Sequence, residues 1–143
     1  MNRYSIKRVD GFNDDISDDL KELHALTFGR LAPPINPEIG VWWIANHGFT
    51  PVGFCALEPS TLFPKAGYIS RVGVLPKHRG NRLQNRFMRV MEAEARRLGW
   101  SVVVSDTTSN PPSANCFIRR GYQTFNPKIL WSLSGAIYWR KRL

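Results

Sequence analysis

The chain has 143 residues, of which 43% are hydrophobic and 22% are charged. These proportions are typical of a globular domain, and they exclude wholesale disorder, a collagen-like repeat and a small disulfide scaffold. The net charge is +9, yet six of the eleven acidic residues fall within the first 22 positions. The rest of the chain is therefore strongly basic, which favours an anionic ligand or partner.

A chain of this length is expected to form one domain, so we assign residues 1–143 to a single unit. No stretch reaches the roughly 18 apolar residues of a membrane span, and the polar N-terminus does not fit a signal peptide. Cys55 and Cys116 each lie in an apolar run, which indicates free thiols in a reducing compartment and hence a cytoplasmic protein. The three histidines are far apart in the sequence, so no metal site is expected.

Up to residue 57, the pattern predicts a strand, a helix, a proline-rich loop and two strands of a hairpin, over residues 3–9, 16–28, 31–40, 41–46 and 52–57. Ser17 or Asp18 is the expected N-terminal cap of the helix, and Gly29 is its expected end. Trp42 and Trp43 are adjacent on a strand and face opposite sides. We expect one of them in the core, and the other is a candidate for lining a cleft.

From residue 67 onward, the pattern predicts a strand, a long helix, a buried strand, a short helix and two closing strands, over residues 67–75, 80–98, 101–105, 113–120, 129–133 and 136–140. This order implies one mixed sheet, largely antiparallel, with a strand–helix–strand crossover in the middle. Gly73 has no side chain, so it predicts either a bulge in its strand or close packing in the core.

The clearest chemical signal lies in residues 74–84, where a strand ends, Pro76 breaks it and a helix follows. The first turn of a helix has unpaired backbone N–H groups at the positive end of its dipole, and Gly80 lets the backbone approach a ligand closely. Four basic side chains surround this point, Lys77, His78, Arg79 and Arg82. Taken singly, Gly80 would be a turn residue and the arginines a solvated face, but together these features predict a phosphate or diphosphate site.

This segment resembles the coenzyme A motif of the GNAT superfamily of N-acetyltransferases, V-x-P-x-x-R-G-x-G/R-x-G/A. The matching residues are Val74, Pro76, Arg79, Gly80 and Arg82. Gln84 departs from the motif, because the family has a small residue there.

A second family motif, N-x-x-A/S-x-x-L-Y-x-x-x-G-F/Y, follows in register. The matching residues are Asn110, Ser113, Phe117, Gly121 and Tyr122. Phe117 stands where many members carry a tyrosine that is assigned as the proton donor to the departing thiolate. A phenyl ring cannot donate a proton, so another group must do so here or the thiolate leaves unassisted.

The resemblance implies a single GNAT-like α/β (α+β) domain, with a mixed, mostly antiparallel sheet split between two central strands and helices on both faces. It also implies direct transfer of an acetyl group from the cosubstrate acetyl-CoA to a primary amine of a small molecule or a protein. A homodimer stays open, and no membrane partner is expected. Two other interpretations remain, a basic nucleic-acid-binding module and a catalytically silent domain that binds coenzyme A.

For coenzyme A, the motifs and the neighbouring strand point to ten residues, Gly73, Val74, Arg79, Gly80, Asn81, Arg82, Leu83, Gln84, Asn110 and Phe117. A free backbone N–H near Val74 is placed to bind the thioester oxygen. The acceptor amine must lose a proton before it attacks, and we favour Glu58 as the base, with Asp106 and Glu38 as alternatives. Ser113 and Tyr122 are candidates for passing the proton on to the thiolate, and we favour Ser113.

Overall fold

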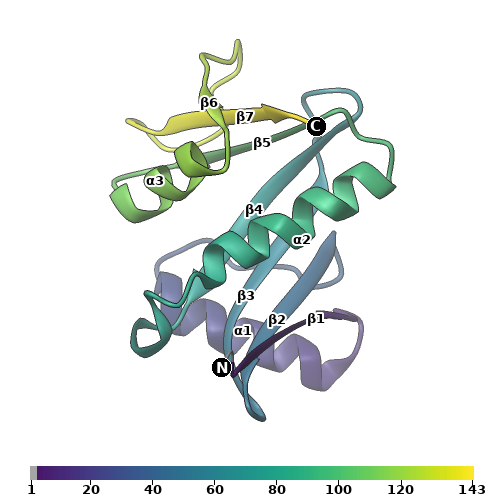
Figure 1. The fold of residues 1–143 in the computed structure, drawn as a ribbon, viewed down its shortest axis with the longest axis vertical. Helices are drawn as coiled ribbons and strands as arrows, with labels where there is room; N and C mark the ends of the chain where they lie inside the picture. Colours follow the sequence, from purple (N-terminus) through teal and green to yellow (C-terminus); the bar gives the residue numbers. More distant parts are fainter. Residues whose placement is uncertain (1–2) are drawn as a thin grey trace.

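The structure, a computed structural model, describes residues 3–143. One seven-stranded sheet has the order β1-β2-β3-β4-β5-β7-β6 (Figure 1). The strands are β1 Tyr4–Val9, β2 Val41–His47, β3 Thr50–Pro59, β4 Ala66–Val74, β5 Val102–Thr107, β6 Gln123–Thr124 and β7 Ile137–Arg142. The helices are α1 Asp14–Phe28, α2 Leu83–Arg97 and α3 Pro111–Arg119, and a 3₁₀ turn, η1, spans Pro76–His78. Only β4 and β5 pair in parallel, which confirms the predicted mixed, mostly antiparallel sheet.

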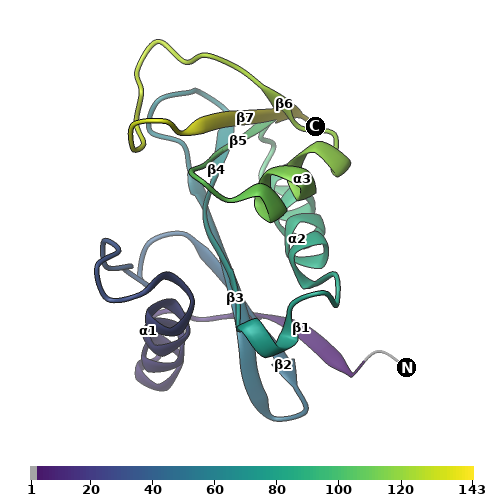
Figure 2. The same ribbon diagram turned by 90° about the vertical axis from the view of Figure 1, so that its left-hand side faces the viewer.

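Helices cover both faces of the sheet, with α1 on one side and α2 and α3 on the other (Figure 2). Residues of β2 alternate between these faces. Trp42 therefore packs in the cluster that contains Leu20 of α1, and Trp43 packs in the cluster that contains Phe87 of α2. The suggestion that one of the two tryptophans lines a cleft is wrong, because each face of β2 is covered and both rings are buried.

The cap of α1 differs from the prediction. Asn13 precedes the helix, and its Oδ1 accepts a hydrogen bond from the N–H of Ile16 at 3.1 Å. Ser17 and Asp18 lie inside the helix, so neither caps it. Gly29 ends the helix as predicted, with a φ of 81° that a residue with a side chain rarely adopts.

The start of α2 was also predicted too early. The helix begins at Leu83 rather than at Gly80. Gly80 has a φ of 81° and Arg82 has a φ of 60°, and neither value is compatible with a right-handed helix. The segment between η1 and α2 is therefore an irregular turn.

Two further expectations are settled by the sheet. Residues 129–133 form no strand, because Ile129 and Leu130 are exposed and belong to the connection between β6 and β7. The bulge in β4 falls at Ser70, between the partners of Ala56 and Leu57 on β3. Gly73 instead allows close packing, since a Cβ there would lie 2.6 Å from a ring carbon of Phe54.

Candidate functional site

The sheet is split between its two central strands. β4 and β5 pair over three positions only, from Ala66 with Val102 to Tyr68 with Val104. Just beyond the last pair, the Ser105 hydroxyl donates a hydrogen bond to the Ile69 carbonyl at 2.9 Å. After that point β5 pairs only with β7, and the rest of β4 has no strand partner on this side.

The open edge of β4 presents backbone groups to the split. The N–H of Leu75 donates to the carbonyl of Val52 at 2.9 Å, so it points toward β3. Backbone groups alternate in direction along a strand, and the N–H groups of Val72 and Val74 therefore point the other way, into the split. An extended chain with amides can pair with such an edge as an added strand does.

The turn between η1 and α2 offers a second set of backbone donors. Within residues 3–143, the N–H groups of residues 80–85 have no hydrogen-bond acceptor, and the first bonded amide of α2 is that of Arg86. The left-handed conformations of Gly80 and Arg82 help to turn the backbone here. Successive unpaired N–H groups next to a left-handed residue form a concave anion site, and the dipole of α2 adds positive potential there.

Basic side chains reinforce this site. Arg79, whose Nε donates to the Val74 carbonyl at 3.2 Å, is held against the end of β4. His78 at the end of η1, Arg82 in the turn and Arg119 of α3 line the same groove. The positive potential is therefore concentrated where the free N–H groups lie.

A groove of about 970 Å³ joins the split strand edge to the turn. Its walls come from the end of α1, from β4, from the turn and start of α2, and from α3. Nine residues predicted for the site line it, Gly73, Val74, Arg79, Gly80, Arg82, Leu83, Gln84, Asn110 and Ser113. Among residues 3–143, no aspartate or glutamate lines the groove.

Three predicted residues lie outside the groove lining. Asn81 turns back on the loop, and its side chain donates to the His78 carbonyl at 3.0 Å. Phe117 is buried behind the groove, where its ring stacks on Trp139 with 5.7 Å between centroids. Glu58 is half-buried near the end of β3, and burial raises the pKa of its carboxyl, although the nearby Arg71 opposes the shift.

Hydrogen bonds position the side of the groove that α3 contributes. Asn110 caps α3, because its Oδ1 accepts a hydrogen bond from the N–H of Ser113 at 3.2 Å. Gln84 of α2 reaches across and donates from Nε2 to the Ser113 hydroxyl at 3.0 Å. The hydroxyl oxygen is thus an acceptor, and its own proton is left to be donated elsewhere.

The alternative base Asp106 is heavily engaged. Its Oδ2 accepts hydrogen bonds from Tyr68 and Trp131, both at 2.8 Å, and its Oδ1 accepts one from Ser132 at 2.9 Å. Burial, followed by the Asp106 carboxylate, raises the pKa of Tyr68, so this hydroxyl stays a donor. Asp106 therefore fastens the connection between β6 and β7 to the end of β5.

Sequence reasoning missed seven residues of the groove lining, Thr27, Phe28, Val72, Asn85, Pro112, Cys116 and Arg119. Thr27 and Phe28 end α1, more than 40 positions before the motif, and only the chain fold brings them to β4. The one available signal was Gly73, whose missing side chain leaves room for Thr27 Oγ1. Arg119 occupies an unspecified position of the second motif on the exposed side of α3, where sequence alone does not distinguish it from a solvated arginine.

Comparison with known proteins places this chain in a family. The model of the acetyltransferase (GNAT) family matches residues 10–122. The chain belongs to the GNAT acetyltransferase family. This confirms the resemblance drawn from the two motifs, and it makes the chain a member of a family of acyltransferases.

Solved structures of other GNAT proteins share the fold. A candidate acyl-CoA N-acyltransferase from Klebsiella pneumoniae is 20% identical, with a TM-score of 0.72 over 98% of this chain and 97% of that one. The yncA protein of Salmonella typhimurium, solved with acetyl-CoA, is 16% identical, with a TM-score of 0.72 over 99% and 94%. The NatC complex bound to Gag peptide and CoA contains a chain that is 17% identical, with a TM-score of 0.75 over 99% of each. No curated protein sequence matches this chain significantly.

Two kinds of feature are absent from the described residues. Among residues 3–143, no three His, Cys, Asp or Glu side chains come together as metal ligands would. In the same part of the chain, no helix has the length and apolar character to cross a bilayer.

Proposed function

We propose that this GNAT protein transfers an acetyl group from acetyl-CoA directly to a primary amine, in a small molecule or a protein. One observation carries the proposal: a groove joins six free backbone N–H groups at the turn to an unpaired strand edge. The first end suits a diphosphate and the second suits an amide-bearing arm. The related folds solved with acetyl-CoA and with CoA support this assignment.

The residues of the groove fit coenzyme A in chemistry as well as in shape. The N–H groups of residues 80–85, with Arg79 and Arg82, would hold the diphosphate, and the Val72 and Val74 edge would hold the pantetheine arm. Bound acetyl-CoA supplies an activated acetyl group as a thioester. The N–H of Val74 would stabilise the negative charge that develops on the thioester oxygen, since a preorganised donor acts strongly in a site shielded from water.

Glu58 is our proposal for the base. A protonated amine with a pKa of about 10.4 must lose its proton, which costs about 4–5 kcal/mol near pH 7. Burial raises the pKa of Glu58, and a base works best when its pKa lies near the working pH. Glu58 lies on β3 next to β4 and outside the groove lining, so proton transfer would reach it through a water.

Ser113 is our proposal for the acid. Its hydroxyl lines the groove and accepts from Gln84, so its proton is available for the sulfur that leaves coenzyme A. Phe117 cannot fill this role, because it is apolar and its ring packs on Trp139. We propose a supporting role for Phe117, as packing beneath the groove wall that Ser113 and Cys116 form.

A second candidate function is a domain that binds coenzyme A without catalysis. The absence of aspartate and glutamate from the groove lining is the observation in its favour. The two candidates differ in whether an acceptor amine causes release of thiol from acetyl-CoA.

For either function, the two buried free cysteines suit the reducing conditions of the cytoplasm, where we place the protein.

The deciding experiment measures the release of free thiol from acetyl-CoA. The purified chain would be mixed with acetyl-CoA and a panel of amines that includes amino acids, polyamines and peptides with free N-termini. We expect thiol release that depends on one class of amine and requires Gly80. If acetyl-CoA stabilises the protein thermally but no amine in the panel causes release of thiol, the silent domain would be established instead.

A further inference from the structure

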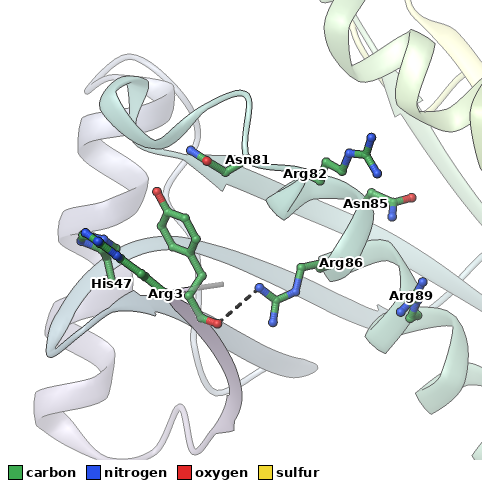
Figure 3. Close-up of a pocket in the computed structure, with 8 residues that line it drawn as sticks. Arg3, His47, Asn81, Arg82, Asn85, Arg86 and Arg89 are labelled. Atoms are coloured by element: carbon green, nitrogen blue, oxygen red, sulfur yellow. Dashed lines mark hydrogen bonds between the residues drawn. The ribbon is translucent and has the colours of Figure 1, made fainter. Parts of the chain in front are cut away.

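A second hollow lies between β1 and the first half of α2, away from the strand split. It has a volume of about 450 Å³. Figure 3 shows side chains that line this hollow, among them four arginines and two asparagines. We call this hollow the arginine pocket and define it by Arg3, Asn81, Arg82, Asn85, Arg86 and Arg89.

The charges of the arginine pocket are not balanced within the protein. No aspartate or glutamate lines it. Among the residues that the structure describes, the side chains of Arg3, Arg82 and Arg89 form no hydrogen bond or ion pair, whereas Arg86 donates to the Tyr4 carbonyl at 3.3 Å. Like charges gathered in one hollow repel each other, and a bound anion would remove that cost.

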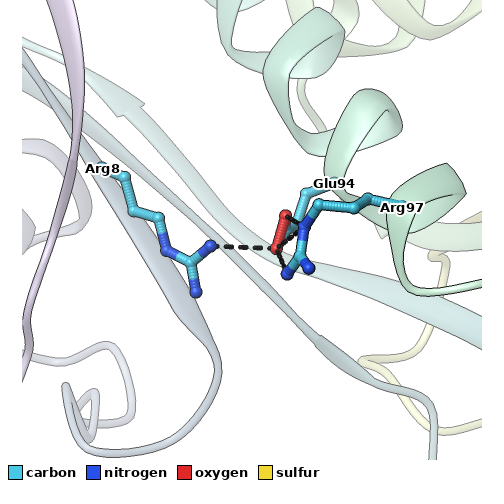
Figure 4. A network of polar contacts seen from close by, with 3 residues as sticks. All are labelled: Arg8, Glu94 and Arg97. Carbon is cyan, nitrogen blue, oxygen red and sulfur yellow. Dashed lines mark hydrogen bonds and ion pairs between the residues drawn. The ribbon is translucent and has the colours of Figure 1, made fainter.

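The positive surface continues along α2 toward its C-terminal end. Arg8, Arg96 and Arg97 extend it beyond Arg89, and the nearby acid is Glu94. Figure 4 shows that Glu94 is already shared, because Arg8 donates to it at 3.0 Å and Arg97 donates to both of its oxygens. The acidic residues of α1 lie on the opposite face of the sheet and do not compensate this surface (Figure 2).

The spacing of the arginines fits a chain of anions better than a single one. With a rise of about 1.5 Å per residue, Arg86 and Arg89 are separated by about 4.5 Å along the helix axis, and Arg96 follows about 10 Å later. Arg82 precedes them at the start of the helix. The cationic residues within α2 are all arginines, namely Arg86, Arg89, Arg96 and Arg97. Arginine presents paired donors that match the oxygens of a phosphate, whereas lysine acts as a point charge.

We propose that the arginine pocket and the outer face of α2 bind the phosphodiester backbone of a single-stranded nucleic acid. The pocket is a hollow of about 450 Å³, which we assign to the backbone of one strand. Arg82 and Asn85 line both this pocket and the groove, so the strand would lie beside the turn on the side of α2 that faces β1. Arg82 is shared with the proposed diphosphate site, whereas Arg3, Arg86 and Arg89 lie outside the groove lining, so failure of this proposal would leave the proposed function untouched.

The test uses fluorescence anisotropy with a short fluorescein-labelled oligouridylate and the same sequence as DNA. The variant Arg3→Glu/Arg89→Glu removes two pocket arginines that do not line the groove. Lys21→Glu/Arg30→Glu is the matched control, because it makes the same charge change at exposed positions in and just after α1. We expect affinity to fall at least about tenfold in the pocket variant and less than about twofold in the control.

Salt dependence provides a second measurement of the same site. Each phosphate contact contributes about 0.7 to the slope of log affinity against log salt for single strands, so the pocket variant should lose about 1.4 from that slope. Both variants should keep the acetyl-CoA affinity of the parent chain, which shows that they are folded. RNA that binds more tightly than DNA would add recognition of the 2′-hydroxyl to the proposal, and equal binding would assign the site to the shared backbone.

Four results would overturn the proposal. Equal losses of affinity in the pocket variant and its control would show that binding depends only on the net charge of the protein. Polyglutamate that competes as well as the strand would show a site for acidic protein. Complete displacement of the strand by saturating coenzyme A would place it in the groove, because only Arg82 and Asn85 of the pocket line that groove. Duplex that binds as tightly as single strand would exclude a one-strand pocket.

Discussion

Lys141 donates a hydrogen bond from Nζ to Oε1 of Glu92 at 2.9 Å and thereby joins β7 to α2. The same carboxylate accepts hydrogen bonds from Arg120 at 2.8 Å and from Tyr122 at 3.1 Å. Glu92 is fully buried, and these three partners lie in or next to the part of the sheet beyond the split. Glu92 therefore ties together the two sides of the structure that form the groove.

Glu92→Gln should destabilise the fold strongly. The variant leaves Arg120 and Lys141 partly buried without a countercharge, and removing one member of such a network costs about 3–5 kcal/mol. Urea unfolding followed by tryptophan fluorescence measures the change. Glu22→Gln, at an exposed position of α1, is the control and should change stability by less than about 0.5 kcal/mol. Equal stability of the two variants would contradict this account.

The same network predicts how stability depends on pH. Burial alone would raise the pKa of Glu92, but hydrogen bonds from Lys141 and Arg120 outweigh it and hold the pKa below its usual value. A carboxyl with a lowered pKa in the folded state contributes stability above its unfolded pKa of about 4.3, and this contribution is lost as pH falls through the folded value. The stability difference between the parent chain and Glu92→Gln should therefore be constant near neutral pH and shrink in acid. A difference that persists unchanged in acid would assign the effect to packing instead of charge.

The diphosphate site is tested by Gly80→Glu. A carboxylate at this position would face the same free N–H groups as the ligand and repel it, so the Kd for acetyl-CoA should rise about 100-fold, or about 2.7 kcal/mol. Gly99→Glu is a close control, because Gly99 has a φ of 80° against 81° at Gly80, and a Cβ at either glycine meets nothing within 4 Å. Isothermal titration calorimetry should show little change for Gly99→Glu. Similar losses in both variants would point to backbone strain and refute the placement of the diphosphate.

Sequence patterns located the turn but not its shape. Apolar spacing predicts one face for Leu83, Phe87, Val90, Met91 and Leu98. Leu83, Phe87 and Met91 are buried, whereas Leu98 is exposed. Spacing does not report φ, so it extended α2 back through Arg82, which is left-handed. The free N–H groups depend on this late helix start. The late start follows from the conformation of Gly80, Asn81 and Arg82, which have no apolar side chain from which spacing could predict it.

Covered faces and loop contacts explain the other differences. Trp42 and Trp43 are both core because helices lie on both sides of β2, which a single strand pattern cannot show. Residues 129–133 looked like a strand because they are apolar, yet Trp131 bonds to Asp106 and holds them as a loop. Thr27 and Phe28 reach the groove only through the packing of α1 on β4, so no local motif identifies them.

Ser113→Ala tests the proposed acid. The substitution removes the hydroxyl but keeps the backbone N–H that Asn110 caps, so α3 should stay intact. We expect kcat to fall about 100-fold while the Kd for acetyl-CoA stays within about twofold, since proton transfer matters only during the reaction. Ser113→Thr keeps a hydroxyl and should recover most of the rate. A threonine variant as slow as the alanine variant would assign Ser113 a structural role.

Glu58→Gln tests the proposed base. A base must be deprotonated to act, so the rate of the parent chain should fall as pH decreases through the pKa of Glu58, which burial has raised. The variant should lose about 100-fold in kcat/KM near neutral pH, and its pH–rate profile should lack that acidic limb. Glu38→Gln, at an exposed position of the proline-rich loop, is the control and should retain the profile. The acidic limb of the profile reports protonation of the base, so only replacement of the base removes it. If the limb disappears in Glu38→Gln and persists in Glu58→Gln, the base is Glu38 in the loop.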